Sequence, residues 1–434
     1  MVESGYREIC AALSIQRGGW YLWDMNQDTY IARTRFVSEV GLSLHACGAT
    51  SQRIERHLKS LCALLEVHGT FLSTPTSFTF CYCLDDPTEQ RVQIERIEPS
   101  DGDLGRLEII DALVNRFESH ELDFEEMCVA FRALDPQQSY YGKWMQAVAW
   151  GVLSVSFAGL FTVVLSDCIA AGGISLLVFL LAQIGGKSQR LEPVIEIIVS
   201  IVAGVCAAVL GWMGFVMNVP LVVLSSVIAF IPGLSLTVAL SEIAERALVS
   251  GTSKLVHALM GLCKLYVGAL LGVGVISIIL PLSGAFETEG VMLLPEWKTM
   301  PLVVFLSLSL TLIFNIRPKL AAWCLAASLL GFSTAQWASG NLGVAAGMFL
   351  GAFVVGTFSN GFANRTNRPA SIVLTQGLIV LVPGSASYMV LDSWITGQNM
   401  LGKVTSMHEA FLTFISLVIG LLLANAILPS RKAL

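Results

Sequence analysis

Two Pro-Gly pairs stand 151 residues apart in strongly apolar surroundings, Pro232-Gly233 and Pro383-Gly384. Proline removes a backbone N–H and clashes with the carbonyl four residues earlier, and glycine accepts the resulting dihedral angles. Each pair therefore predicts a break in an apolar helix that frees backbone polar groups. Inside a bilayer such groups need protein, water or a polar solute as partner. One isolated pair favours a kinked packing helix, but two at equivalent positions favour a site for a small polar solute.

The residues after each pair supply hydroxyl groups to such a site. Ser235 and Thr237 follow the first pair, and Ser385, Ser387 and Tyr388 follow the second. We predict that these side chains, together with both Pro-Gly pairs, bind the solute.

Ionisable residues in apolar spans are functional candidates because an unpaired charge in lipid is costly. Six lie in or beside the spans: Asp167, Glu196, Lys264, Asp392, His408 and Glu409. Asp167 is suited to exchange a proton or to pair with a solute ammonium group, and Lys264 needs a carboxylate or carbonyl partner. The predicted proton-coupling set is Asp167, Glu196, Lys264, His408 and Glu409. For each of them a water-facing position at a helix end is the alternative.

The composition indicates that membrane helices position these residues. Of 434 residues, 54% are hydrophobic and 13% are charged, against about 25% charged in an average soluble protein. This balance excludes a mainly soluble enzyme, a disordered chain and a disulfide scaffold. The sequence also lacks the H-E-x-x-H, G-x-S-x-G, Walker A and G-x-G-x-x-G patterns. We therefore predict no catalytic residues, cofactor, metal or nucleic acid.

The charges divide the chain into two regions. Residues 1–142 have a net charge of −10, and residues 143–434 have a net charge of +4. The first 30 residues carry charges throughout, so we expect no cleavable signal peptide and a cytoplasmic location for 1–142. Its cysteines form no C-x-x-C pair, and we expect them to be reduced.

Apolar spacing predicts a small α+β domain in residues 1–142. Apolar residues recur every three, four and seven positions from 35 to 66, which predicts one helix of about eight turns. Segments 69–73, 77–83 and 91–97 predict three strands, the last two as a hairpin. Residues 103–119 and 123–134 predict two further helices, with Asp123 as the N-cap of the second.

His45 and Glu55 in this domain suggest the general base and general acid of an enzyme. Their spacing of ten residues makes a shared site on one helix only marginally feasible. A regulatory or gating domain is therefore favoured over an enzyme.

The membrane region divides into ten candidate spans of bilayer length. Their ranges are 145–165, 168–184, 194–216, 220–240, 254–281, 301–316, 319–337, 341–360, 370–391 and 408–428. With a cytoplasmic start, eleven Lys and Arg residues fall in inside loops and two, Lys298 and Lys403, in outside loops. We expect a multi-pass inner or plasma membrane protein with both termini in the cytoplasm.

The same offset of 151 residues relates further positions of the two halves. Leu240 matches Leu391, Gly251 matches Gly402, and His257 matches His408. Five spans separate the copies, so the copies run in opposite directions across the membrane. This predicts two five-helix inverted repeats, 143–282 and 300–434, the architecture of many secondary transporters.

Residues 41–55 resemble the helix signature of the threonine/serine exporter family, with Gly48, Arg53 and Glu55 at motif positions. The membrane region resembles the family's other signatures at Ser166-Asp167, residues 231–234, Glu242, Gly251, residues 381–384 and Tyr388. The resemblance covers about residues 35–425, in a form that fuses two halves that some bacteria encode as separate subunits. It implies an exporter and adds Glu242 to the substrate-binding residues.

These observations predict a secondary exporter driven by the proton motive force. Threonine and serine are the first substrates and small dicarboxylates such as succinate the second. A membrane-tethered enzyme and a passive channel are alternatives from other classes. The expected partners are the substrate, protons and lipid, and a homo-oligomer is left open.

Overall fold

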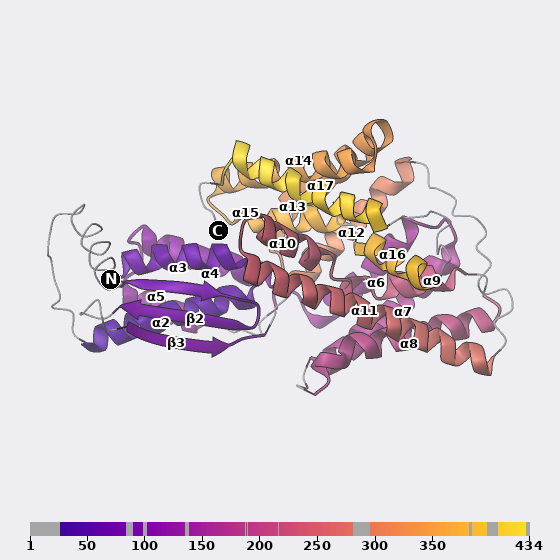
Figure 1. Ribbon diagram of the computed structural model, residues 1–434, viewed down its shortest axis with the longest axis horizontal. Coiled ribbons are helices and arrows are strands. Elements are labelled where there is room, and N and C mark those ends of the chain that lie inside the picture. The colour runs from indigo at the N-terminus through magenta and orange to yellow at the C-terminus, as the bar shows by residue number, and fades with distance from the viewer. Residues whose placement is uncertain are drawn as a thin grey trace, which may run out of the picture.

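The structure is a computed structural model that describes residues 27–83, 90–98, 102–134, 139–186, 188, 190–215, 217–280, 296–381, 384–396 and 407–430. A small N-terminal unit lies at one end of the molecule, and the remaining helices extend from it along the long axis (Figure 1). We call residues 27–134 the N-unit and the helices from residue 143 onward the helical region.

The described residues of the N-unit form four helices and a three-stranded sheet. Its elements are α2 (Gln27–Ala46), α3 (Ser51–Leu64), β1 (Gly69–Ser73), β2 (Ser77–Cys83), β3 (Gln90–Arg96), α4 (Leu104–Glu118) and α5 (Phe124–Arg132). The strands are antiparallel in the order β1-β2-β3. Helix α2 packs closely on β2, because a Cβ added to Gly41 would stand 3.0 Å from the Phe80 ring and 3.1 Å from the Phe78 ring.

One helix prediction in the N-unit is wrong. The expected helix over 35–66 is two helices, separated by residues 47–50. Gly48 has a φ of 75° there, in the left-handed region that favours glycine. The three strands and the two later helices are present, and Asp123 with Glu126 forms a capping box at the start of α5.

The helical region contains twelve α-helices among the described residues. They are α6 (Lys143–Gly159), α7 (Leu165–Gly185), α8 (Ile195–Trp212), α9 (Val219–Ser226), α10 (Gly233–Ala244), α11 (Leu248–Ile279), α12 (Glu296–Ile313), α13 (Pro318–Leu342), α14 (Val344–Thr366), α15 (Ala370–Leu381), α16 (Gly384–Thr396) and α17 (Met407–Ile427). Short 3-10 helices, η1 (Glu192–Val194) and η2 (Ile228–Phe230), precede α8 and α10.

Five of the described helical segments are long and apolar enough to cross a membrane. They are Leu165–Gly185, Glu192–Trp212, Leu248–Ile279, Val344–Thr366 and His408–Ile427. Helix α9 and the segment Ile228–Ala244 pass the same test together as a pair bent by 54°. The helices Thr299–Ile313 and Ala370–Leu381 are apolar but shorter. The chain is thus a polytopic membrane protein, and the count of ten spans stays a prediction.

Helix pairings recur along the helical region. Three pairings in the first half have counterparts in the second. The pair α6–α7 corresponds to α12–α13, α7–α9 to α13–α15, and α8–α11 to α14–α17. Contacts between α6 and α12 and between α10 and α16 join the two sets.

The N-unit and the helical region share an apolar core. Ile316, Leu320, Phe362 and Ile372 belong to the same buried cluster as the core of the N-unit. Arg368 binds Glu108 of α4 at 2.5 Å, and Arg317 approaches the other Glu108 oxygen at 3.8 Å. The N-unit is therefore docked on the helical region through buried side chains.

Candidate functional site

The glycines of the two Pro-Gly pairs meet inside the helical region. Helix α10 begins at Gly233 and α16 begins at Gly384. A Cβ added to Gly384 would stand 3.0 Å from the Gly233 Cα and 3.4 Å from the Gly233 nitrogen. Pro232 is the N-cap of α10, whereas Pro383 lies outside the described residues. Two helix N-termini, from chain segments 151 residues apart, thus touch at their first residues.

The predicted hydroxyl groups are distributed unequally around this crossing. Thr237 is fully buried and donates to the Gly233 carbonyl at 3.2 Å, within its own helix. Ser235 and Ser387 are half-buried, and Tyr388 is 1% exposed. The Ser385 side chain lies outside the described residues.

Asp167 is buried in the first turn of α7, with 1% exposure. Its Oδ2 accepts a hydrogen bond from the Thr162 hydroxyl at 3.0 Å, and its Oδ1 accepts one from the Asn218 backbone N–H at 3.0 Å. Asn218 in turn caps α9, accepting from the Leu221 N–H with its side chain. The carboxylate therefore lies between the N-termini of α7 and α9, where helix dipoles favour negative charge.

Glu196 and Lys264 form an ion pair with each other. Lys264 Nζ lies 3.1 Å from Glu196 Oε2 and donates to the Pro193 carbonyl at 3.2 Å. The expectation that Lys264 needs such partners is thus met. His408 and Glu409 are exposed at the start of α17.

Glu242 lies at the contact between the helical region and the N-unit. It is 2% exposed and forms an ion pair with Lys254 of α11. It also accepts from the Ser250 hydroxyl at 2.7 Å and from the Ser51 backbone N–H, at the start of α3, at 3.3 Å. The Ser51 and Ser250 hydroxyl oxygens are 2.7 Å apart. Glu242 thus binds α10 to α11 and to the N-unit, nine residues from Gly233.

A buried polar cluster that the sequence did not predict joins α15, the helix before Gly384, to α12 and α13. Gln376 of α15 donates to the Ser307 and Thr311 hydroxyls of α12, at 2.9 Å each. Ser307 donates to Ser328 of α13 at 3.0 Å. The signal that marks it is a glutamine in an apolar helix, eight residues before Gly384.

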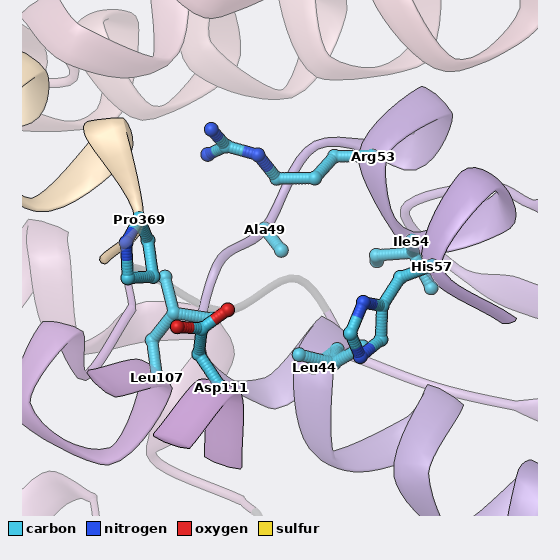
Figure 2. Close-up of a pocket in the computed structure, with 8 residues that line it drawn as sticks. All are labelled: Leu44, Ala49, Arg53, Ile54, His57, Leu107, Asp111 and Pro369. Carbon is cyan, nitrogen blue, oxygen red and sulfur yellow. The ribbon is translucent and has the colours of Figure 1, made fainter. Parts of the chain in front are cut away.

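A small pocket opens between the N-unit and the α14–α15 connection (Figure 2). Arg53 and His57 of α3 reach toward it from one side, and Asp111 of α4 and Pro369 lie on the other. Burial lowers the pKa of the Arg53 guanidinium, and the Asp111 carboxylate opposes this shift. The pocket is part of the docking contact, and its lining includes no residue of α10 or α16.

His45 and Glu55 engage separate partners. Glu55 accepts from the Ser73 backbone N–H at 3.0 Å, and His45 Nε2 lies 3.2 Å from the Glu98 carbonyl oxygen. Burial lowers the pKa of His45. Glu55 thus binds the end of β1 and His45 binds the segment after β3, and their observed contacts do not form an acid–base pair.

Several bilayer-length apolar helices define a polytopic membrane protein. Threonine/serine exporter family models match residues 35–276 and residues 299–427. The chain therefore belongs to the threonine/serine exporter family, and both halves of that family are present in one chain.

Two curated fungal proteins are similar to this chain, and both are named Pheromone-regulated membrane protein 10. The protein from Eremothecium gossypii is 24% identical over 390 residues, which cover 85% of this chain and 50% of the relative. The protein from Saccharomyces cerevisiae is 21% identical over 398 residues, covering 88% of this chain and 50% of the relative. The chain thus spans about half the length of these relatives. No solved structure matches it.

Proposed function

We propose that the protein is a secondary exporter of small polar metabolites, driven by the proton motive force, with threonine and serine as its first substrates. The observation that carries this proposal is the contact of Gly233 with Gly384. Broken helices that meet in the interior of a transporter are where substrates bind in many secondary transporters. Membership of the exporter family supports export as the direction of transport.

The substrate binds where α10 and α16 meet. Each helix N-terminus carries partial positive charge, so the crossing favours a carboxylate. Ser235 and Ser387 then lie within one turn of the breaks, where they serve the substrate's polar groups. Because two N-termini meet, a small dicarboxylate such as succinate is the second candidate.

Transport uses two inverted five-helix repeats, residues 143–282 and 300–434, which together cross the membrane ten times. The recurring pairings, α6 with α7 and α12 with α13, α8 with α11 and α14 with α17, support this arrangement. Alternating access then comes from movement of one repeat against the other around the crossing.

Proton coupling uses Asp167. Its carboxylate is buried and its observed donors, Thr162 and the Asn218 N–H, are neutral. Protonation therefore changes the net charge of this region between the N-termini of α7 and α9. Neutralisation of the carboxylate weakens both hydrogen bonds.

The protein lies in the plasma membrane, or inner membrane, with the N-unit and both termini in the cytoplasm. Arg317 and Arg368, which contact the N-unit, are on connections expected inside. Cytoplasmic loops carry an excess of Lys and Arg.

Efflux from loaded cells tests the proposal. Cells with and without the full chain are loaded with labelled threonine, serine or succinate, and efflux is followed with and without an uncoupler. The proposal expects faster efflux of threonine and serine that the uncoupler suppresses. Equal flux with uncoupler supports a passive channel instead, and chemical turnover by the purified chain supports an enzyme.

A further inference from the structure

A buried carboxylate outside the proposed coupling set lies on α16, two turns after the second break. Asp392 is 7% exposed, eight residues after Gly384. Tyr266 of α11 donates a hydrogen bond of 2.9 Å to its Oδ1. This bond joins a helix of the first half of the helical region to a helix of the second half.

Aromatic contacts lead from this carboxylate back to the crossing. The Tyr266 ring packs edge-to-face on the Tyr388 ring, with centroids 5.4 Å apart and an interplanar angle of 69°. Both tyrosines are 1% exposed, and Tyr388 is one turn after Gly384 on α16. Two packed rings therefore connect Asp392 to the proposed substrate position.

The equivalent place on α10 also carries an acid. The offset of 151 residues aligns Ser241-Glu242 with Asp392-Ser393, an acid and a serine in exchanged order. Glu242 is paired with Lys254, twelve residues before Tyr266 on the same helix α11, a rise of about 18 Å. One acid of this pair therefore has a lysine as its partner, whereas Tyr266 offers the other a neutral phenol.

We infer that Asp392 is a second coupling carboxylate, which binds and releases a proton in each transport cycle, and that Tyr266 is its positioning residue. This inference rests on the proposed function. The charged carboxylate accepts the Tyr266 hydrogen bond strongly and holds α16 against α11. Protonation forms one O–H bond at the carboxylate, weakens the Tyr266 bond and frees α16 to move, and the proton later returns to water.

The described charged groups on the helices packed on α16 either form ion pairs or are exposed. Helices α10, α11 and α17 contact α16. On α11, Lys264 is paired with Glu196 and Lys254 with Glu242, the acid of α10. Cys263 and His257 of α11 and His408 and Glu409 of α17 are exposed. Among the described residues, Tyr266 donates its hydroxyl hydrogen bond to Asp392, and the Tyr388 ring packs on the Tyr266 ring.

Reconstituted full-length protein separates coupling from substrate binding. Exchange of labelled for unlabelled threonine without a pH gradient reports substrate binding and the substrate-loaded movement. Accumulation driven by an imposed pH gradient reports coupling. Asp392→Asn is expected to keep exchange within about twofold and to lose gradient-driven accumulation at least tenfold, and Asp392→Glu is expected to restore part of it.

Tyr266→Phe supplies a second readout. The ring contact with Tyr388 remains, but the carboxylate loses a donor that favours its charged form. The pH of half-maximal transport is therefore expected to move upward, whereas Tyr140→Phe, at an exposed tyrosine outside the spans, leaves it unchanged. If Asp392→Asn does not fold, the pH profile of Tyr266→Phe alone tests the inference.

Two results overturn the inference. One is full gradient-driven accumulation by Asp392→Asn, and the other is a pH profile of Tyr266→Phe that equals that of the wild type. A wild-type protein that neither exchanges nor accumulates threonine or succinate contradicts the proposed function itself.

Discussion

Gly384 on α16 lies so close to Gly233 on α10 that a Cβ added to Gly384 would stand 3.0 Å from the Gly233 Cα. The nearest atom is backbone, which cannot rotate away as a flexible side chain does. The approach of the two half-helices therefore requires glycine at position 384, and the crossing depends on this contact.

Replacement of Gly384 by alanine is expected to force α16 away from α10. Overpacking of this kind costs about 1–3 kcal/mol, and we expect export to fall at least tenfold. The matched control is Gly173→Ala on α7, where an added Cβ meets nothing within 4 Å. Labelled-threonine efflux and thermal unfolding in detergent check both variants. Normal export by Gly384→Ala would show that the crossing does not contribute to transport.

Asp167→Asn is expected to abolish coupled export while the protein stays in the membrane. The amide keeps the shape of the side chain but cannot exchange a proton, and its NH2 group faces either Thr162 or the Asn218 N–H, which both donate to Asp167. Uncoupler-sensitive efflux measures the effect. Retention of that efflux at the wild-type level would remove Asp167 from the mechanism.

Glu242→Gln is expected to destabilise the protein by about 3–5 kcal/mol, because Lys254 is left without its buried partner. The double variant Glu242→Gln with Lys254→Met removes the lone cation and is expected to recover part of this loss. Thermal unfolding of the purified variants measures both. Equal melting temperatures for wild type and Glu242→Gln would contradict a stabilising role of this pair.

Gly105→Ala is expected to displace the N-unit from the helical region. An added Cβ would overlap the Asn315 carbonyl oxygen, at 2.1 Å, whereas at Gly142 it would meet nothing within 4 Å. Cysteines placed at Ser51 and Ser250, whose oxygens are 2.7 Å apart, report docking by disulfide formation. We expect a lower disulfide yield with Gly105→Ala and an unchanged yield with Gly142→Ala; equal yields would refute the prediction.

The orientation prediction is checked by labelling single cysteines from either side of the membrane. Positions 285–298 should react from outside only, and positions 187–190 and 365–368 from inside only. Reaction of Arg365→Cys from outside would exclude the ten-span count.

Local signals predicted much of the N-unit. The alternating pattern of residues 77–83 and the Asp123 N-cap each depend on only a few neighbouring residues. The structure contains both the strand and the helix that they predict. The break at Gly48 was missed because the apolar spacing continues through it, while the backbone turns at a φ of 75°.

Contacts between distant segments account for most of what the sequence did not predict. The offset of 151 residues relates the two Pro-Gly pairs, but the contact between Gly384 and Gly233 is visible only in the structure. The partners of Glu242 include Ser51, 191 residues earlier, which no spacing rule connects. Gln376 joins α15 to α12 through Ser307, and such a cluster needs the helix packing to be known.

The most direct test of proton-driven export is uphill transport by purified protein in sealed vesicles. Proteoliposomes that contain the full chain are given equal labelled threonine on both sides, and a pH gradient is then imposed. We expect net movement of threonine against its own gradient, which an uncoupler abolishes and Asp167→Asn prevents. Threonine that stays equal on both sides under the gradient, with unimpaired downhill flux, would contradict it.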